Sequence, residues 1–107
     1  MPSKLGEKIS KQRKKQGDTL EELADKAKIS KSYLWELENR DEPPSLSAEK
    51  LTRLADALGV TVGYLLDDDI REPEEKHVDE AFYRSYQNLE AQDKGQLRKI
   101  LEAFKKE

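Results

Sequence analysis

Residues 19–39, TLEELADKAKISKSYLWELEN, decide the fold of this chain. The apolar residues of the first half recur at helical spacing: Leu20, Leu23, Ala24 and Ala27. Thr19 stands three residues before Glu22, which is the spacing of a capping box at a helix start. Ser30 is placed to cap a second helix over residues 31–39. The stretch therefore predicts two short helices joined by a tight turn at residues 28–29.

The second of these helices has a buried side and an exposed side. Leu34 and Leu37 must face inward, so helical periodicity turns four other side chains toward more exposed faces: Lys31, Ser32, Trp35 and Glu36. Two helices joined in this way form a helix-turn-helix, which places the start of its second helix in the major groove of DNA.

The flanking sequence completes a small domain. A helix over residues 3–16 ends at Gly17, and Ser47 caps a further helix that ends at Gly59. A short last helix carries Tyr64, Leu65 and Leu66. We therefore predict an all-α, five-helix DNA-binding domain over residues 1–66.

The remaining residues predict an acidic linker at 67–74 and a C-terminal helical segment at 75–107, with Pro73 able to start the first helix and Asp93 able to cap the second. Each helix has one apolar stripe, and together the stripes contain Val78, Phe82, Tyr86, Leu89, Leu97, Ile100, Leu101 and Phe104. Two such helices are not stable alone in water. The stripes could pack on a second copy of the chain, on the domain itself or on another protein; we favour a second copy, as a dimerisation hairpin.

Charge is unevenly distributed along the 107 residues. The net charge is −3, yet residues 1–31 contain nine Lys and Arg against five Asp and Glu, and residues 67–107 contain eight against twelve. Basic charge therefore accompanies the predicted DNA-reading motif, and the acidic excess lies in the tail. The acidic balance of the whole chain argues against indiscriminate coating of nucleic acid.

Several other classes of protein are disfavoured by composition. The chain has no cysteine, and its single histidine, His77, lies in an acidic segment, so we expect no metal site, no cofactor and no catalytic residue. Mean hydropathy is −0.99 and no apolar run is long enough to span a membrane, so we expect a cytoplasmic protein without membrane contact.

Short motifs along residues 5–66 occur in a distinctive order: Arg13, Gly17, TLEELA at 19–24, IS at 29–30, LxxLEN at 34–39 and LxxLAxxLGV at 51–60. In this order and spacing the chain resembles the Xre/Cro-like helix-turn-helix family of phage repressors and bacterial regulators. The resemblance implies a lambda-repressor-like fold and binding to double-stranded DNA. It covers the first part of the chain and does not extend to the tail.

The resemblance also implies roles for individual residues. Base contacts are implied for Lys31, Ser32 and Glu36, phosphate contacts for Thr19, Ser30 and Asn39, and a buried ion pair for Arg13 and Glu38. The chemistry agrees with these roles, because lysine can donate to guanine and glutamate can accept from cytosine. We add Trp35 as a base contact, although it could equally cover the next loop, and Tyr33 and Arg40 as phosphate contacts.

Two departures from the family pattern bear on the site. Leu20 stands where many relatives have a phosphate-binding glutamine, and Arg40 replaces the usual glycine, so that turn must form without glycine's freedom. We expect a sequence-specific regulator, more readily a repressor, that reads a near-palindromic operator as a homodimer. The rival hypothesis is an antitoxin-type regulator whose tail binds a protein encoded nearby.

Overall fold

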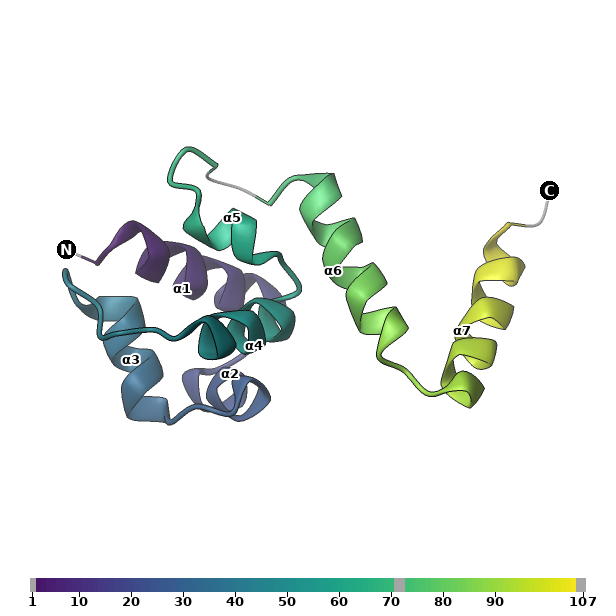
Figure 1. Cartoon of the computed structure of the whole chain (residues 1–107), viewed down its shortest axis with the longest axis horizontal. Coiled ribbons are helices and arrows are strands. Elements are labelled where there is room, and N and C mark those ends of the chain that lie inside the picture. Colours follow the sequence, from purple (N-terminus) through teal and green to yellow (C-terminus); the bar gives the residue numbers. More distant parts are fainter. Residues whose placement is uncertain (1, 71–72, 106–107) are drawn as a thin grey trace.

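The computed structural model describes residues 2–70 and 73–105, and its secondary structure there is entirely helical (Figure 1). In chain order the helices are α1 (Lys4–Gln16), α2 (Leu20–Ala27), α3 (Lys31–Asn39), α4 (Ala48–Leu58), α5 (Val62–Leu66), α6 (Glu75–Gln87) and α7 (Ala91–Phe104). The predicted all-α fold, with five helices followed by two, is confirmed.

Local signals at the helix ends explain why the first five helices begin and end where they do. Each begins after a serine or threonine whose hydroxyl oxygen accepts a hydrogen bond from a backbone N–H in the first turn: Ser3, Thr19, Ser30, Ser47 and Thr61. Gly17 and Gly59 end α1 and α4 in the left-handed conformation, with φ of 81° and 69°. Lys28 makes the turn between α2 and α3 at φ 58°, which costs a residue with a side chain about 1 kcal/mol.

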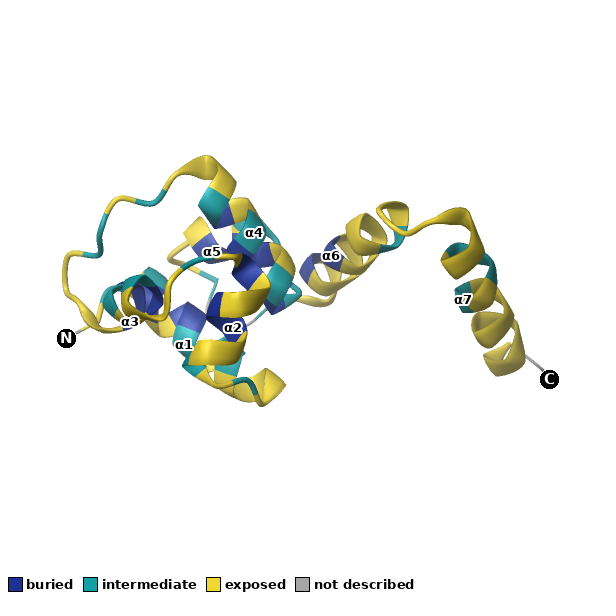
Figure 2. Cartoon of the chain, turned by 90° about the horizontal axis from the view of Figure 1, so that it is seen from below, coloured by how far each residue is buried: buried dark blue, intermediate teal, exposed yellow. Residues whose placement is uncertain are grey.

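The hydrophobic core joins α1 to α5 into one domain. Its largest fully buried side chains are Ile9, Leu23, Leu34, Leu37, Leu54, Leu58, Val60, Tyr64 and Leu65. Figure 2 shows the buried positions concentrated where these five helices meet. Because burying one such side chain contributes roughly 1.5–3 kcal/mol, this cluster is the main source of the domain's stability.

The crossing of α1 over α3 is unusually close. A Cβ added to Gly6, which is buried in α1, would lie 2.5 Å from the carbonyl oxygen of Leu37 in α3. Any side chain at this position would force the two helices apart. Because Gly6 has no side chain, the inner side of α3 packs directly on α1, and the opposite side of α3 remains exposed.

The tail begins differently from the sequence-based expectation. Pro73 does not start α6, which begins at Glu75 after Glu74 as N-cap, and Asp93 does not cap α7, which begins at Ala91 after Glu90. The expected helix start at Pro73 is wrong by two residues and the expected cap at Asp93 by three, because Glu74 and Glu90 adopt the extended backbone conformation of an N-cap.

The two tail helices differ in how they meet the domain. In α6, His77 and Ala81 are each only 7% exposed, and Arg84 pairs with Asp56 of α4 at 3.2 Å. In α7 none of the described residues is buried, and the helix lies away from α1–α5 (Figure 1). The apolar stripe that includes Val78 and Phe82 is on a different side of α6 from the docked residues and stays exposed.

Candidate nucleic-acid interface

The exposed side of α3 collects the residues for which base contacts are predicted. Lys31, Ser32 and Trp35 are exposed and Glu36 is half-buried, whereas Leu34, Leu37 and Glu38 on the other side are buried. Trp35 is 51% exposed, which is a large apolar surface to leave in water. The four predicted base-contact residues therefore share one face of one helix, with donors and an acceptor suited to base edges.

The start of α3 presents hydrogen-bond donors of the kind that suit an anion. The Ser30 hydroxyl oxygen accepts from the Tyr33 N–H at 3.0 Å. A hydroxyl that accepts in this way keeps its hydrogen for another acceptor. Helix starts also attract anions through their free N–H groups. Ser30 can thus cap the helix and donate to a phosphate oxygen at the same time.

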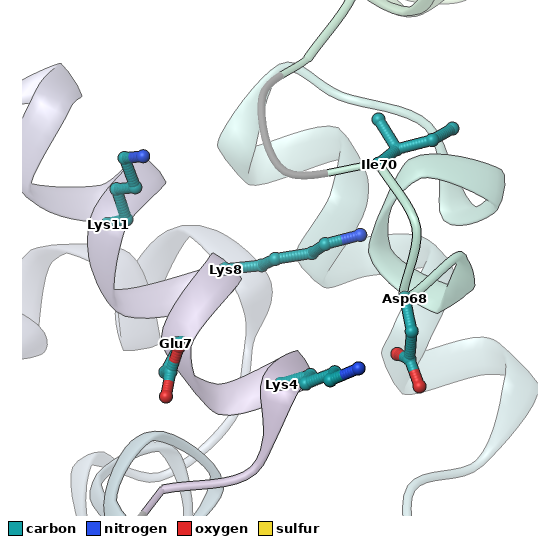
Figure 3. A pocket seen from close by; sticks show the side chains of 6 residues that line it. All are labelled: Lys4, Glu7, Lys8, Lys11, Asp68 and Ile70. Carbon is teal, nitrogen blue, oxygen red and sulfur yellow. The ribbon is translucent and has the colours of Figure 1, made fainter.

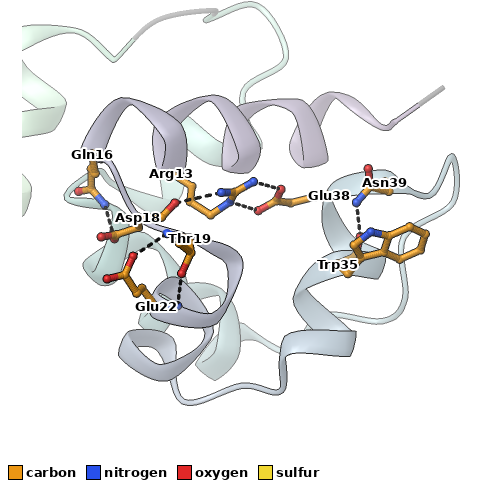
Figure 4. A network of polar contacts seen from close by, with 8 residues as sticks. All are labelled: Arg13, Gln16, Asp18, Thr19, Glu22, Trp35, Glu38 and Asn39. Atoms are coloured by element: carbon orange, nitrogen blue, oxygen red, sulfur yellow. Dashed lines mark hydrogen bonds and ion pairs between the residues drawn. The ribbon is translucent and has the colours of Figure 1, made fainter.

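Thr19 repeats this arrangement at the start of α2. Its hydroxyl oxygen accepts from the Glu22 N–H at 3.1 Å, and the Glu22 carboxylate accepts from the Thr19 N–H at 2.8 Å, as Figure 4 shows. The predicted capping box is confirmed. The hydroxyl hydrogen of Thr19 is again left to donate outward.

Arg13 and Glu38 form an ion pair that holds α1 to α3. The Arg13 Nε donates to Glu38 Oε2 at 2.8 Å and Nη2 donates to Oε1 at 2.9 Å, while Nη1 donates to the Asp18 carbonyl at 3.0 Å (Figure 4). The hydrogen bonds to Glu38 raise the pKa of Arg13, outweighing the opposite effect of burial. The structure thus brings together the two residues for which the pair is predicted, directly behind the exposed face of α3.

Tyr33 is occupied by the protein itself. Its hydroxyl donates to the Ser45 carbonyl, and the Lys50 ammonium lies 4.6 Å from the centre of its ring. Burial raises the pKa of the Tyr33 hydroxyl. Tyr33 therefore fastens the loop before α4 onto α3. Because a phosphodiester can only accept hydrogen bonds, the predicted phosphate contact requires the Tyr33 hydroxyl to leave the Ser45 carbonyl.

Asn39 and Arg40 lie at the far end of α3. The Asn39 side-chain amide donates to the Trp35 carbonyl at 2.9 Å, which leaves its oxygen as an acceptor and one hydrogen to donate (Figure 4). Arg40 leaves the helix in an extended conformation, with φ −84° and ψ 145°, so the turn without glycine forms with no left-handed residue. The Arg40 side chain is exposed and can reach outward.

A family model described as helix-turn-helix matches residues 9–65, which include α2, α3 and nearly all of the core. The chain belongs to the Xre/Cro-like helix-turn-helix family of DNA-binding transcriptional regulators.

The chain is similar to a bacterial transcriptional regulator and to its solved structures. The transcriptional regulator SinR of Bacillus subtilis (strain 168) is 39% identical over 64 residues, which are 60% of this chain and 57% of that protein. A crystal structure of SinR, a master regulator for biofilm formation, in complex with DNA has a TM-score of 0.55 at 38% identity. It covers 59% of this chain and 98% of that one.

A second solved structure extends the likeness into the tail. The SinR protein/SinI protein complex has a TM-score of 0.57 at 28% identity and covers 94% of this chain and 94% of that chain. Similarity to helix-turn-helix regulators is thus strongest in α1–α5, and the fold of α6 and α7 also has a counterpart.

Metal-binding clusters and membrane-spanning helices are both absent from the part of the chain that the structure describes. Residues 2–70 and 73–105 contain no group of three or more His, Cys, Asp or Glu placed to hold a metal ion. Within the same ranges no helix has the length and apolar character needed to cross a membrane.

Two residues near the domain's junction with the tail escaped the sequence-based prediction. Lys8 in α1 is only 7% exposed, and His77 in α6 is equally buried. Charge and helical periodicity do not predict the burial of either residue, because each is buried by contact with another helix.

Proposed function

We propose that the chain is a repressor that reads a near-palindromic operator as a homodimer, and that it performs no catalysis. The observation that carries this proposal is the face of α3 formed by Lys31, Ser32, Trp35 and Glu36, beginning at the Ser30 cap. Occupying a promoter is enough to repress transcription, so this surface needs no reactive group. Such a regulator acts where the DNA is, in the cytoplasm of a prokaryote.

Each residue of the interface has a distinct task in this proposal. Lys31 donates to guanine O6 or N7, Glu36 accepts from cytosine N4, and Ser32 donates or accepts according to the base it meets. Trp35 packs on a thymine methyl group. The phosphates are bound by Thr19, Ser30, Tyr33, Asn39 and Arg40, which fix the position of the helix on the duplex.

The tail supplies dimerisation in this proposal, and residues 67–74 serve as the boundary between the two functional segments. The apolar stripes of α6 and α7 are half-buried or exposed in the single chain; Ile100 is 55% and Phe104 is 82% exposed. Residues 73–90 carry two basic and five acidic residues, whereas 91–105 carry four basic and two acidic. A second copy offers α7 both an apolar stripe and the opposite charge on α6.

A partner-binding regulator is the alternative function, and one observation favours it. The SinR/SinI structure, which covers nearly all of this chain, is a complex of two different proteins. The same exposed stripes would accept an amphipathic helical hairpin from another protein in place of a second copy. A small protein encoded beside this chain and co-purifying with it would support this alternative.

Selection of bound sequences from a random DNA library tests the proposed function. We expect two inverted half-sites whose centres lie about 10 base pairs, or a multiple of that, apart. Truncation after Asp69 should give a monomer in analytical ultracentrifugation with much weaker binding to the selected operator. A truncated chain that stays dimeric, or a selection that yields no inverted repeat, would contradict the proposed dimer.

The base-contact assignment has its own test. Lys31→Ala and Ser32→Ala should each weaken operator binding by about 5- to 150-fold, equivalent to roughly 1–3 kcal/mol, without lowering thermal stability. Lys15→Ala, which removes an exposed lysine from the last turn of α1, outside the residues assigned to DNA or to the dimer, is the matched control and should bind like the parent. If both α3 variants bind as tightly as the control, the recognition surface is misassigned.

A further inference from the structure

Lys8 joins α1 to the point where the chain leaves the DNA-binding domain. Its ammonium donates to the Tyr64 carbonyl at 2.6 Å and to the Asp67 carbonyl. It also lies 4.5 Å from the centre of the Tyr64 ring. Figure 3 shows the Lys8 side chain extending from α1 toward the segment that follows α5. One buried cation therefore holds both the end of α5 and the first residue beyond it.

The other side of this junction belongs to α6. The His77 ring lies 5.8 Å from the Tyr64 ring at an angle of 47°. The Nδ1 of His77 accepts from the Glu74 N–H at 3.0 Å, which fixes the first turn of α6. Tyr64 is 1% exposed, so it links Lys8 and His77 through the interior and not through solvent.

The contact continues along α6 beyond its first turn. Ala81 is 7% exposed, and Arg84 pairs with Asp56 of α4. His77, Ala81 and Arg84 are spaced at i, i+4 and i+7, which is one face of a helix. The outward stripe with Val78 and Phe82 is left for the dimer, so α6 contacts the domain on one side and offers a dimerisation surface on another.

The buried position of Lys8 is better explained by a role in orienting the end of α5 than by a contribution to the stability of the domain. Burying an ammonium is costly, and burial is the main reason that the pKa of Lys8 is lowered. Its two acceptors are carbonyls at the end of α5, where backbone carbonyls lack helical partners and cations are favoured. An apolar side chain could fill this space, but it could not hold two carbonyls in a defined direction.

We propose that the junction of Lys8, Tyr64 and His77 fixes the direction in which α6 leaves the DNA-binding domain, and so sets the half-site spacing that the dimer reads. This inference rests on the proposed homodimer. Lys8 acts as a positioning residue, because it lies outside the residues assigned to DNA contact and works through Tyr64.

Helical geometry explains why a fixed junction selects spacing. Moving one half-site by a single base pair turns it by about 34° around the DNA axis. A rigid dimer cannot follow this rotation, so one of its two recognition helices loses the groove. A dimer with loosely attached domains can follow it and keeps the benefit of binding at two sites.

The inference is tested by competition binding with a series of operators. These operators have the same half-sites, but the spacing between the half-sites is changed by one or two base pairs. The parent should bind the altered operators at least about tenfold more weakly than the best one. Lys8→Met removes the ammonium but keeps the length of the side chain. It should bind the best operator like the parent and lose no more than about threefold on the altered ones.

Two further variants make this test decisive. Lys4→Met removes an exposed lysine one turn earlier, from the same surface hollow (Figure 3), and should keep the parent's spacing preference. Ala81→Gln loosens α6 from the other side without altering charge or the main core, and should broaden spacing as Lys8→Met does. If circular dichroism shows that Lys8→Met is unfolded, the spacing preference of Ala81→Gln alone tests the role of the junction.

The outcomes separate the inference from the function on which it rests. Folded Lys8→Met and Ala81→Gln chains that both keep the parent's spacing preference would overturn the role of the junction while leaving the dimeric repressor intact. A parent chain that binds single half-sites as well as paired ones would overturn the homodimer itself, and the junction's role with it.

Discussion

Replacing Glu38 by glutamine tests the ion pair that supports the recognition helix. The Glu38 side chain is 3% exposed and the Arg13 side chain is 12% exposed, and two hydrogen bonds of 2.8 and 2.9 Å join them. Glutamine has nearly the same size as glutamate, so packing is retained. It leaves the Arg13 guanidinium with one neutral acceptor in place of a carboxylate.

The expected loss can be worked from this geometry. Removing one partner of a buried ion pair costs about 3–5 kcal/mol. The acceptor that glutamine keeps and the partial exposure of Arg13 reduce this to roughly 2–3 kcal/mol. In a domain of this size such a loss lowers Tm by roughly 10–20 °C. Glu49→Gln, which breaks the more exposed pair with Arg53 on α4, should cost less than about 0.5 kcal/mol and is the matched control.

A double-mutant cycle measured by urea unfolding gives the interaction itself. Arg13→Met, Glu38→Gln and the double variant are followed by far-ultraviolet circular dichroism. Because the double variant buries neither charge alone, it should be more stable than the sum of the single losses predicts, with a coupling energy of about 2 kcal/mol. A coupling energy below about 0.5 kcal/mol would refute the argument that this pair holds α1 to α3.

Three further substitutions test features of the fold. Gly6→Ala should destabilise the domain by about 2 kcal/mol, because the new Cβ meets a backbone carbonyl of α3, whereas Gly95→Ala, with nothing within 4 Å, should increase helicity in α7. Lys28→Gly should stabilise the turn by about 1 kcal/mol in chemical unfolding, since glycine adopts a positive φ without strain. Tyr33→Phe should cost about 1 kcal/mol at neutral pH through loss of the bond to the Ser45 carbonyl. Burial raises the folded-state pKa of Tyr33 above its usual 10.0, so the parent should lose stability as pH rises from there toward that higher pKa. The phenylalanine variant should lose less over the same range, and equal slopes would contradict the assignment.

Local signals made the first five helices predictable. The Thr19–Glu22 capping box and the Ser30 cap depend on residues within one turn of each other, so the sequence contains the whole interaction. The exposed face of α3 followed from periodicity once Leu34 and Leu37 were placed inward. These features needed no knowledge of distant contacts.

Contacts between distant segments were beyond such reasoning. Lys8 meets the end of α5 more than fifty residues later, and His77 is buried by Tyr64. A lysine on a basic helix normally predicts exposure, and only the path of the chain after α5 reverses this. The starts of α6 and α7 were misplaced for a related reason, because proline and aspartate are permissive signals that mark a region more reliably than a residue.

The exposed state of α7 has a consequence for how the cell would set the amount of active regulator. Since α7 finds no cover within its own chain, in the proposed homodimer its apolar stripe is buried only when two copies meet. When most chains are single, halving their concentration lowers the dimer roughly fourfold. Single chains also present loosely held helices to proteases, which act on open segments. Removal of single chains by proteases would then make operator occupancy depend more steeply on the rate of synthesis. Modest changes in synthesis would switch the operator between empty and occupied.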